Sequence, residues 1–230
     1  MKKILFVLMA CVLCIGLVGG AFAYFSDTET SSGNTFTAGT LDLVLSNDGS
    51  SYTDGVVATW VSPTNWAPGD PEVIAELRMQ NSGTIGVKLV GVKAQSLSET
   101  PGSDMTDNIA DNIIVTTIKY TEGGSYLYGN LISYYGPIMD GGPGGNGDGV
   151  LTLREFVNSP YNMLFWIGNP PDDARPDYLP AGNAGTEKVE LGFTLPSTAE
   201  NDCQGDQAGF ELLITAYQSF NDVNISGWGP

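Results

Sequence analysis

Apolar and polar residues alternate with period two in several segments, which is the pattern of a β-strand with one buried face. Residues 56–61 and 113–120 are rich in strand-forming residues and predict two further strands. The turn sequence 81–83 directly follows one alternating segment, so we expect 73–79 and 85–89 to form a hairpin. The apolar positions of the alternating segments are Leu41, Leu43 and Leu45; Val73, Ala75, Leu77 and Met79; Ile85, Val87 and Leu89; Val189, Leu191, Phe193 and Leu195; and Phe210, Leu212, Ile214 and Ala216.

Helical signals are few. Thr152-Leu153-Arg154-Glu155 predicts a capping box that opens a short helix, and residues 104–112 predict a turn or two of another. The stretch 95–185 is rich in Gly, Pro, Asp and Asn, so we interpret it as a loop-rich insertion into one domain. These patterns predict an all-β fold, an antiparallel β-sandwich with short helices in its connections.

Residues 1–23 predict a secretory signal peptide, with two lysines, an apolar stretch over 4–18 and a small-residue cleavage site at Ala21 and Ala23. Cleavage by signal peptidase after Ala23 leaves residues 24–230 as a single secreted domain. The alternative is an uncleaved membrane anchor, for which the apolar stretch is somewhat short.

Charge excludes several classes of function. The chain has 26 acidic and 9 basic residues, no histidine and a formal charge of −17, which becomes −19 once the two signal lysines are removed. Such a chain is not expected to bind nucleic acid or an anionic membrane, and it cannot build His-dependent catalytic or zinc sites. Cys203 is the one cysteine left after cleavage, so an intrachain disulfide is excluded.

Motifs near both ends carry a resemblance to a known family. Residues 23–30 read Ala-Tyr-Phe-Ser-Asp-Thr-Glu-Thr, and 34–43 read Asn-Thr-Phe-Thr-Ala-Gly-Thr-Leu-Asp-Leu. Weaker matches are Pro-Gly-Asp at 68–70, Asn-Ser-Gly-Thr at 81–84 and Ala-Tyr-Gln at 216–218. Together these motifs resemble the TasA/camelysin family of exported biofilm-matrix proteins, to which archaeal bundling-pilus subunits are similar.

The resemblance implies a jelly-roll-like sandwich that polymerises with copies of itself, and with other matrix components, outside the cell. The N-terminal segment of one subunit, residues 24–36, is then expected to complete the sheet of the next by donor-strand complementation. Tyr24, Phe25 and Phe36 are its apolar anchors. An extended peptide that adds to an exposed sheet edge gains main-chain hydrogen bonds and a register set by alternate side chains. The alternative is that this segment is an ordinary first strand or a disordered leader.

Part of this family carries a metallopeptidase label, which the composition does not support. Without histidine there is no His-Glu-x-x-His motif, and a site made of carboxylates alone is a poor match for catalytic zinc. We therefore expect no enzymatic activity.

Residues 146–155 resemble an EF-hand calcium loop from its third position to its twelfth, with Gly144 where the first Asp is expected. Asp140 could reach in across the glycines and supply the missing carboxylate. The alternative is a Gly-rich loop held by the capping box without metal. The predicted ligands of a structural Ca²⁺ ion are Asp140, Asn146, Asp148, Val150, Thr152 and Glu155.

Three functions remain open. The first is a structural subunit of an extracellular filament, pilus or biofilm-matrix fibre. The alternative is a monomeric, calcium-dependent binding module of the cell surface or matrix that takes polysaccharide. The third is a secreted metallopeptidase, which the absence of histidine opposes.

Overall fold

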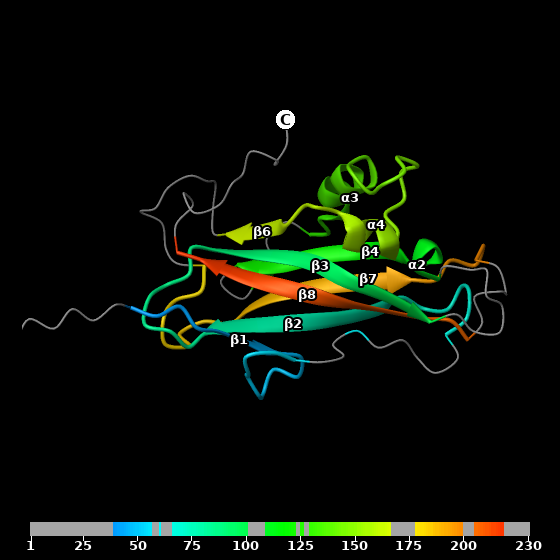
Figure 1. The fold of residues 1–230 in the computed structure, drawn as a ribbon. Coiled ribbons are helices and arrows are strands. Elements are labelled where there is room, and N and C mark those ends of the chain that lie inside the picture. Colours follow the sequence, from blue (N-terminus) through cyan, green and yellow to red (C-terminus); the bar gives the residue numbers. More distant parts are fainter. Residues whose placement is uncertain are drawn as a thin grey trace, which may run out of the picture. The chain divides into compact units, whose positions relative to one another are not determined.

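Two antiparallel sheets form the body of the protein, as Figure 1 shows. The first has the strand order β1-β2-β7-β4-β5 and the second the order β6-β3-β8, which confirms the predicted all-β sandwich. The computed structural model describes residues 39–56, 60, 66–100, 109–122, 125–126, 129–166, 178–199 and 205–218. The elements are β1 (Leu43–Ser46), β2 (Val73–Asn81), β3 (Leu89–Thr100), α2 (Ile109–Asn112), β4 (Ile114–Glu122), β5 (Ser125–Tyr126), α3 (Ile132–Asp140), α4 (Leu153–Asn158), β6 (Met163–Trp166), β7 (Glu187–Thr194) and β8 (Gln207–Tyr217).

The core lies between the sheets and is made by the apolar members of the alternating segments. Val189 and Leu191 of β7 are completely buried, as are Val90 and Val92 of β3. Met79 of β2 joins the same cluster. The period-two pattern therefore placed Met79, Val189 and Leu191 on the buried face of their strands, whereas Val90 and Val92 lie beyond the alternating segment predicted at 85–89.

The hairpin predicted from residues 73–79 and 85–89 is wrong, because β2 and β3 lie in different sheets. Asn81 explains the crossing, since it is completely buried and its Nδ2 donates to the backbone oxygens of Ile85 and Leu179 at 2.8 and 3.2 Å. A buried amide held in this way ties the turn after β2 to the backbone near Leu179.

The stretch interpreted as a loop-rich insertion contains folded elements as well as loops. It includes β4, which lies inside the five-stranded sheet between β7 and β5, together with β6 and the helices α2, α3 and α4. The predicted strand at 113–120 is confirmed as β4. Of the strand predicted at 56–61, residues 57–59 and 61 lie outside the described residues.

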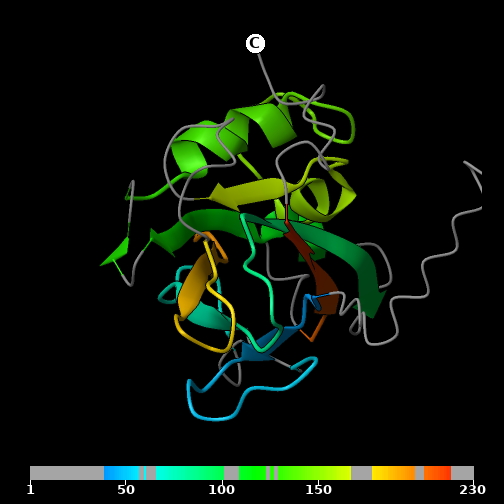
Figure 2. The same cartoon turned by 90° about the vertical axis from the view of Figure 1, so that its left-hand side faces the viewer.

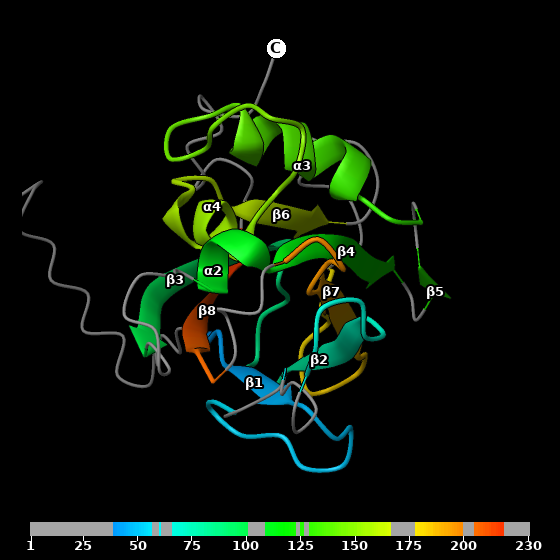
Figure 3. The same ribbon diagram turned by 90° about the vertical axis from the view of Figure 1, so that its right-hand side faces the viewer.

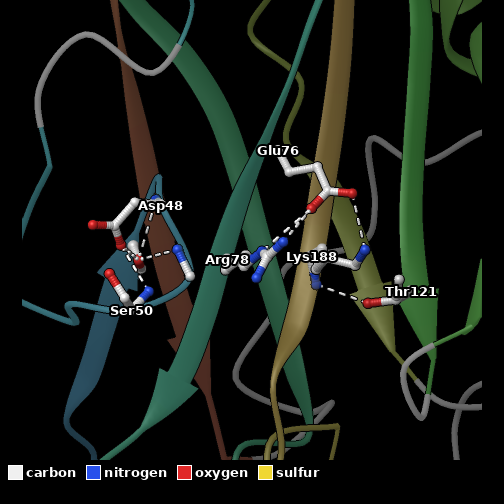
Figure 4. Close-up of polar contacts among 8 residues, drawn as sticks. Asp48, Ser50, Glu76, Arg78, Thr121 and Lys188 are labelled. Atoms are coloured by element: carbon white, nitrogen blue, oxygen red, sulfur yellow. Dashed lines mark hydrogen bonds and ion pairs between the residues drawn. The ribbon is translucent and has the colours of Figure 1, made fainter.

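Charged side chains on the outer face of the five-stranded sheet form ion pairs with one another (Figure 4). Glu76 of β2 accepts from Arg78 at 3.1 Å and from Lys188 of β7 at 2.9 Å. Lys119 of β4 pairs with Glu190 of β7 at 2.8 Å. Partly exposed pairs of this kind contribute about 0.2–1 kcal/mol each, so they keep this face polar more than they stabilise the fold.

A tight turn after β1 is organised by Asp48 (Figure 4). Its carboxylate accepts from the backbone nitrogens of Ser50 at 2.8 Å and Ser51 at 3.0 Å, and from the Ser46 hydroxyl at 2.8 Å. The hydrogen bonds from Ser51, Ser50 and Ser46 hold the pKa of Asp48 well below its usual range. The acidic side chain is therefore a structural part of this turn.

Candidate assembly groove and acidic loop

A groove of mixed polarity opens between β8 and the β1–β2 end of the other sheet, with a cavity volume of about 520 Å³. Most of its lining side chains are aliphatic or aromatic, and Gln95 and Glu211 add polar atoms. The lining residues are Leu45, Val56, Trp60, Leu77, Gln95, Ala208, Gly209, Phe210, Glu211, Leu212 and Leu213.

Among the described residues, the groove lies on the side of the sandwich where inward-facing side chains are least covered. Phe210 and Leu212 of β8 point at the core but are only half-buried, whereas Val189 and Leu191 of the interior strand β7 are completely buried. The views in Figures 2 and 3 place β1 on the side opposite to α3. On the α3 side the buried Tyr135 donates its hydroxyl to a β6 backbone oxygen at 3.3 Å. In the part of the chain that the structure describes, α3 therefore covers one side of the sandwich, and inward-facing apolar groups stay partly accessible on the other.

Four aromatic rings connect the groove to the core. Trp60 lies with its ring centroid 6.3 Å from that of Phe210 and 6.4 Å from that of Phe193. Phe156 of α4 completes the cluster at 6.5 Å from Phe210. The indole nitrogen of Trp60 donates to the backbone oxygen of Leu191 at 2.8 Å, which fixes the ring. Paired rings of this kind contribute to stability beyond their buried area. Sequence analysis missed the role of Trp60 because its partners lie far away along the chain.

Asp140, the last residue of α3, turns its carboxylate into the glycine-rich loop, and its predicted role as a calcium ligand stays a prediction. It is 4% exposed and accepts from the backbone nitrogens of Gly147 at 2.9 Å and Gly149 at 2.8 Å. Both glycines have positive φ, 76° and 90°, which L-residues with side chains rarely adopt. The loop therefore wraps around this buried carboxylate.

Glu155 holds the same loop from the other side. It is 5% exposed, and its carboxylate accepts from the backbone nitrogen of Asn146 at 2.9 Å and from that of Thr152 at 2.9 Å. The Thr152 hydroxyl in turn accepts from the Glu155 backbone nitrogen, so the predicted capping box is confirmed.

The remaining predicted ligands Asn146, Asp148 and Val150 contact one another in the loop. Asp148 is exposed, and its carboxylate accepts from the Val150 backbone nitrogen at 2.8 Å and from the Asn146 amide at 3.2 Å. In the part of the chain that the structure describes, no three His, Cys, Asp or Glu side chains are grouped so that they could hold a metal ion. Calcium binding stays a prediction.

The other predicted site residues, Tyr24, Phe25 and Phe36 of the donor segment and Ala21 and Ala23 of the cleavage site, lie outside the described residues.

The sequence profile of a family described as camelysin metallo-endopeptidase matches residues 1–125, more than half of the chain. The chain belongs to the camelysin family. Members of the TasA/camelysin family are extracellular or surface proteins. The match covers β1 to β4 and ends at the start of β5. The comparison with curated proteins found no match. Over the residues described, no helix is long and apolar enough to span a membrane.

The family's description implies a catalytic metal, and the side chains of this camelysin-family chain do not fit one. Catalytic zinc is held mainly by imidazole nitrogen or thiolate, and the chain has no histidine at all. The buried carboxylates of Asp140 and Glu155 lie beyond the matched residues, and both accept hydrogen bonds from the backbone. No catalytic step is therefore assigned to this chain.

Proposed function

We propose that this camelysin-family chain is a non-catalytic subunit of an extracellular filament or biofilm-matrix fibre, which polymerises by donating residues 24–36 to the next subunit. The observation that carries the proposal is the groove on the open side of the sandwich. The half-buried Leu45, Phe210 and Leu212 give this groove of mixed polarity an apolar part that a strand from another molecule can cover.

The physical argument has two steps. An extended segment that enters the groove buries apolar anchors and satisfies free backbone groups at the sheet edge at the same time. Because donor and acceptor are different surfaces, the contact is head-to-tail and does not close on itself, so it generates filaments. Removal of residues 1–23 then frees the donor outside the cell.

The direct test is electron microscopy of the chain that begins at Tyr24, beside a chain that lacks residues 24–36. We expect filaments from the intact chain and monomers from the shortened one. Filaments from the shortened chain would exclude the segment as donor. Monomers from both chains would contradict the filament proposal.

The groove also favours a second candidate, the monomeric polysaccharide-binding module. Trp60 offers an aromatic surface, and Gln95 and Glu211 line the same groove with hydrogen-bonding atoms. Such a module would remain monomeric in the test above and would be retained on a polysaccharide column.

We further propose that the loop between α3 and α4 binds a structural Ca²⁺ ion. The arrangement of helix, glycine-rich loop and helix supports this, as does Asp140, whose carboxylate contacts the loop at Gly147 and Gly149. Asp148→Asn is the informative variant because it removes one charge without touching the capping box. Asp54→Asn, on another exposed turn, is its control.

Millimolar Ca²⁺ should raise the melting temperature of the unaltered chain and of Asp54→Asn, and raise it less in Asp148→Asn. A melting temperature that Ca²⁺ leaves unchanged in the unaltered chain would contradict calcium binding.

A further inference from the structure

We infer that the edge of β8 to which no described strand pairs is the edge that accepts residues 24–36 of a second copy, with one end of that segment anchored in the groove. The inference rests on the proposed function and adds where on the subunit the donor pairs. The edge strands of the two sheets differ in length and in how far they are covered.

Each sheet ends in two edge strands, β1 and β5 in one and β6 and β8 in the other. The edge of β1 is already covered, because Leu45 and Thr53 exchange both backbone hydrogen bonds, at 2.7 and 2.9 Å. The turn organised by Asp48 lies directly between these two residues. An incoming strand would have to displace this folded segment.

The edges on the other side are short. β5 contains two residues and β6 four. Tyr135 of α3 lies beside β6, because its hydroxyl donates to the backbone oxygen of Leu164. A two- or four-residue edge offers few main-chain hydrogen bonds to an added strand.

β8 differs from these edges in length and in exposure. It contains 11 residues, and among the described strands it pairs with β3 alone. At about 3.3 Å per residue it spans about 36 Å, and the 13 residues from 24 to 36 span about 43 Å when extended. β8 is thus the one edge of matching length in the part of the chain that the structure describes.

The groove runs beside this edge and determines where an anchor can enter. Its β8 lining extends from Ala208 to Leu213, about 20 Å of strand. Tyr24 and Phe36 are 12 residues apart, so an extended donor places them on the same face but about 40 Å from each other. The groove therefore takes the anchor at one end of the donor, and the polar residues between the anchors follow the edge of β8.

A mixing experiment tests this assignment. Ala208 is half-buried at the groove, so Ala208→Trp should fill the acceptor and leave the donor intact. The chain lacking residues 24–36 keeps the acceptor groove but has no donor. Each should be monomeric alone, and together they should form a one-to-one dimer that grows no further. Ile74→Trp, at a 48% exposed position on β2, is the matched control and should polymerise.

Cross-linking provides an independent readout on assembled filaments of chains that carry Cys203→Ser. One set combines Glu211→Cys on β8 with a single cysteine at Ser26, Thr28, Thr30 or Ser32. The other set combines the same donor cysteines with Ser51→Cys beside β1. Disulfides need Cα atoms within about 7 Å, so covalent multimers should appear in the β8 set and be absent from the β1 set.

The outcomes separate the two proposals. Ala208→Trp filaments, or cross-links confined to the β1 set, would overturn the assignment of β8 and leave the filament function standing. An intact chain that never polymerises would remove the proposed function and this inference with it.

Discussion

Trp60 holds the open side of the sandwich together, because its ring contacts Phe193 of one sheet and Phe210 of the other. Trp60→Ala removes these ring contacts and the hydrogen bond to Leu191, so it should lower the free energy of unfolding by about 3 kcal/mol. Trp66 is the control, since its indole makes a longer hydrogen bond, 3.4 Å to the Pro71 oxygen. Urea unfolding should show a smaller loss for Trp66→Ala, and equal losses would contradict the role given to Trp60.

The neighbouring tyrosines of α3 give a prediction for alkaline pH. Burial raises the pKa of Tyr135, while Tyr134 is 54% exposed. The unfolded chain loses the Tyr135 proton near pH 10 and the folded chain holds it, so stability falls as pH rises above about 10. Tyr135→Phe should flatten this decline in unfolding measurements from pH 8 to 11, whereas Tyr134→Phe should not. A decline that is equally steep in all three chains would contradict this assignment.

At the scale of elements, α4 depends on the cap that starts it. Thr152→Ala removes the acceptor of the Glu155 backbone nitrogen and should cost about 1 kcal/mol of stability. Thr152→Ser keeps that acceptor and should cost less. Thermal unfolding distinguishes the two, and equal losses would show that the methyl group of Thr152, not its hydroxyl, stabilises the helix start.

Local sequence predicted those elements whose signals are local. The alternation in 187–194 and 207–217 identified strands, and the spacing of Thr152 and Glu155 identified a helix start. These signals depend on neighbours along the chain, so no knowledge of the tertiary fold was needed.

The missed features depend on tertiary contacts. The sequence patterns predicted no helix over 132–140; Pro137 inside α3 removes a backbone hydrogen bond, and burial of Tyr135 and Met139 against the body of the protein offsets that loss. The crossing at Asn81 depends on Leu179, almost a hundred residues later. The groove was likewise hidden, because it is formed where the edges of two sheets meet.

At the scale of the whole molecule, charge opposes assembly. Residues 24–230 carry a formal charge of −19, and the proposed donation would bring Asp27 and Glu29 toward Glu211 of the accepting edge. Raising the salt from about 0.01 to 0.15 M shortens the screening length from about 30 to 8 Å. Light scattering should therefore show faster filament growth with salt, and a weaker dependence for Glu211→Gln. Growth that slows with salt would contradict strand donation between these acidic surfaces.

The central claim is that residues 24–36 act as a strand for another molecule. The most direct measurement adds that segment as a synthetic peptide to the chain that lacks it and follows binding and melting temperature. We expect saturable one-to-one binding and, at a hundredfold excess over the dissociation constant, a stabilisation of about 2.7 kcal/mol. A peptide of the same composition in scrambled order should do neither. If the native-order peptide leaves the protein unbound and its melting temperature unchanged, residues 24–36 are not a donor strand.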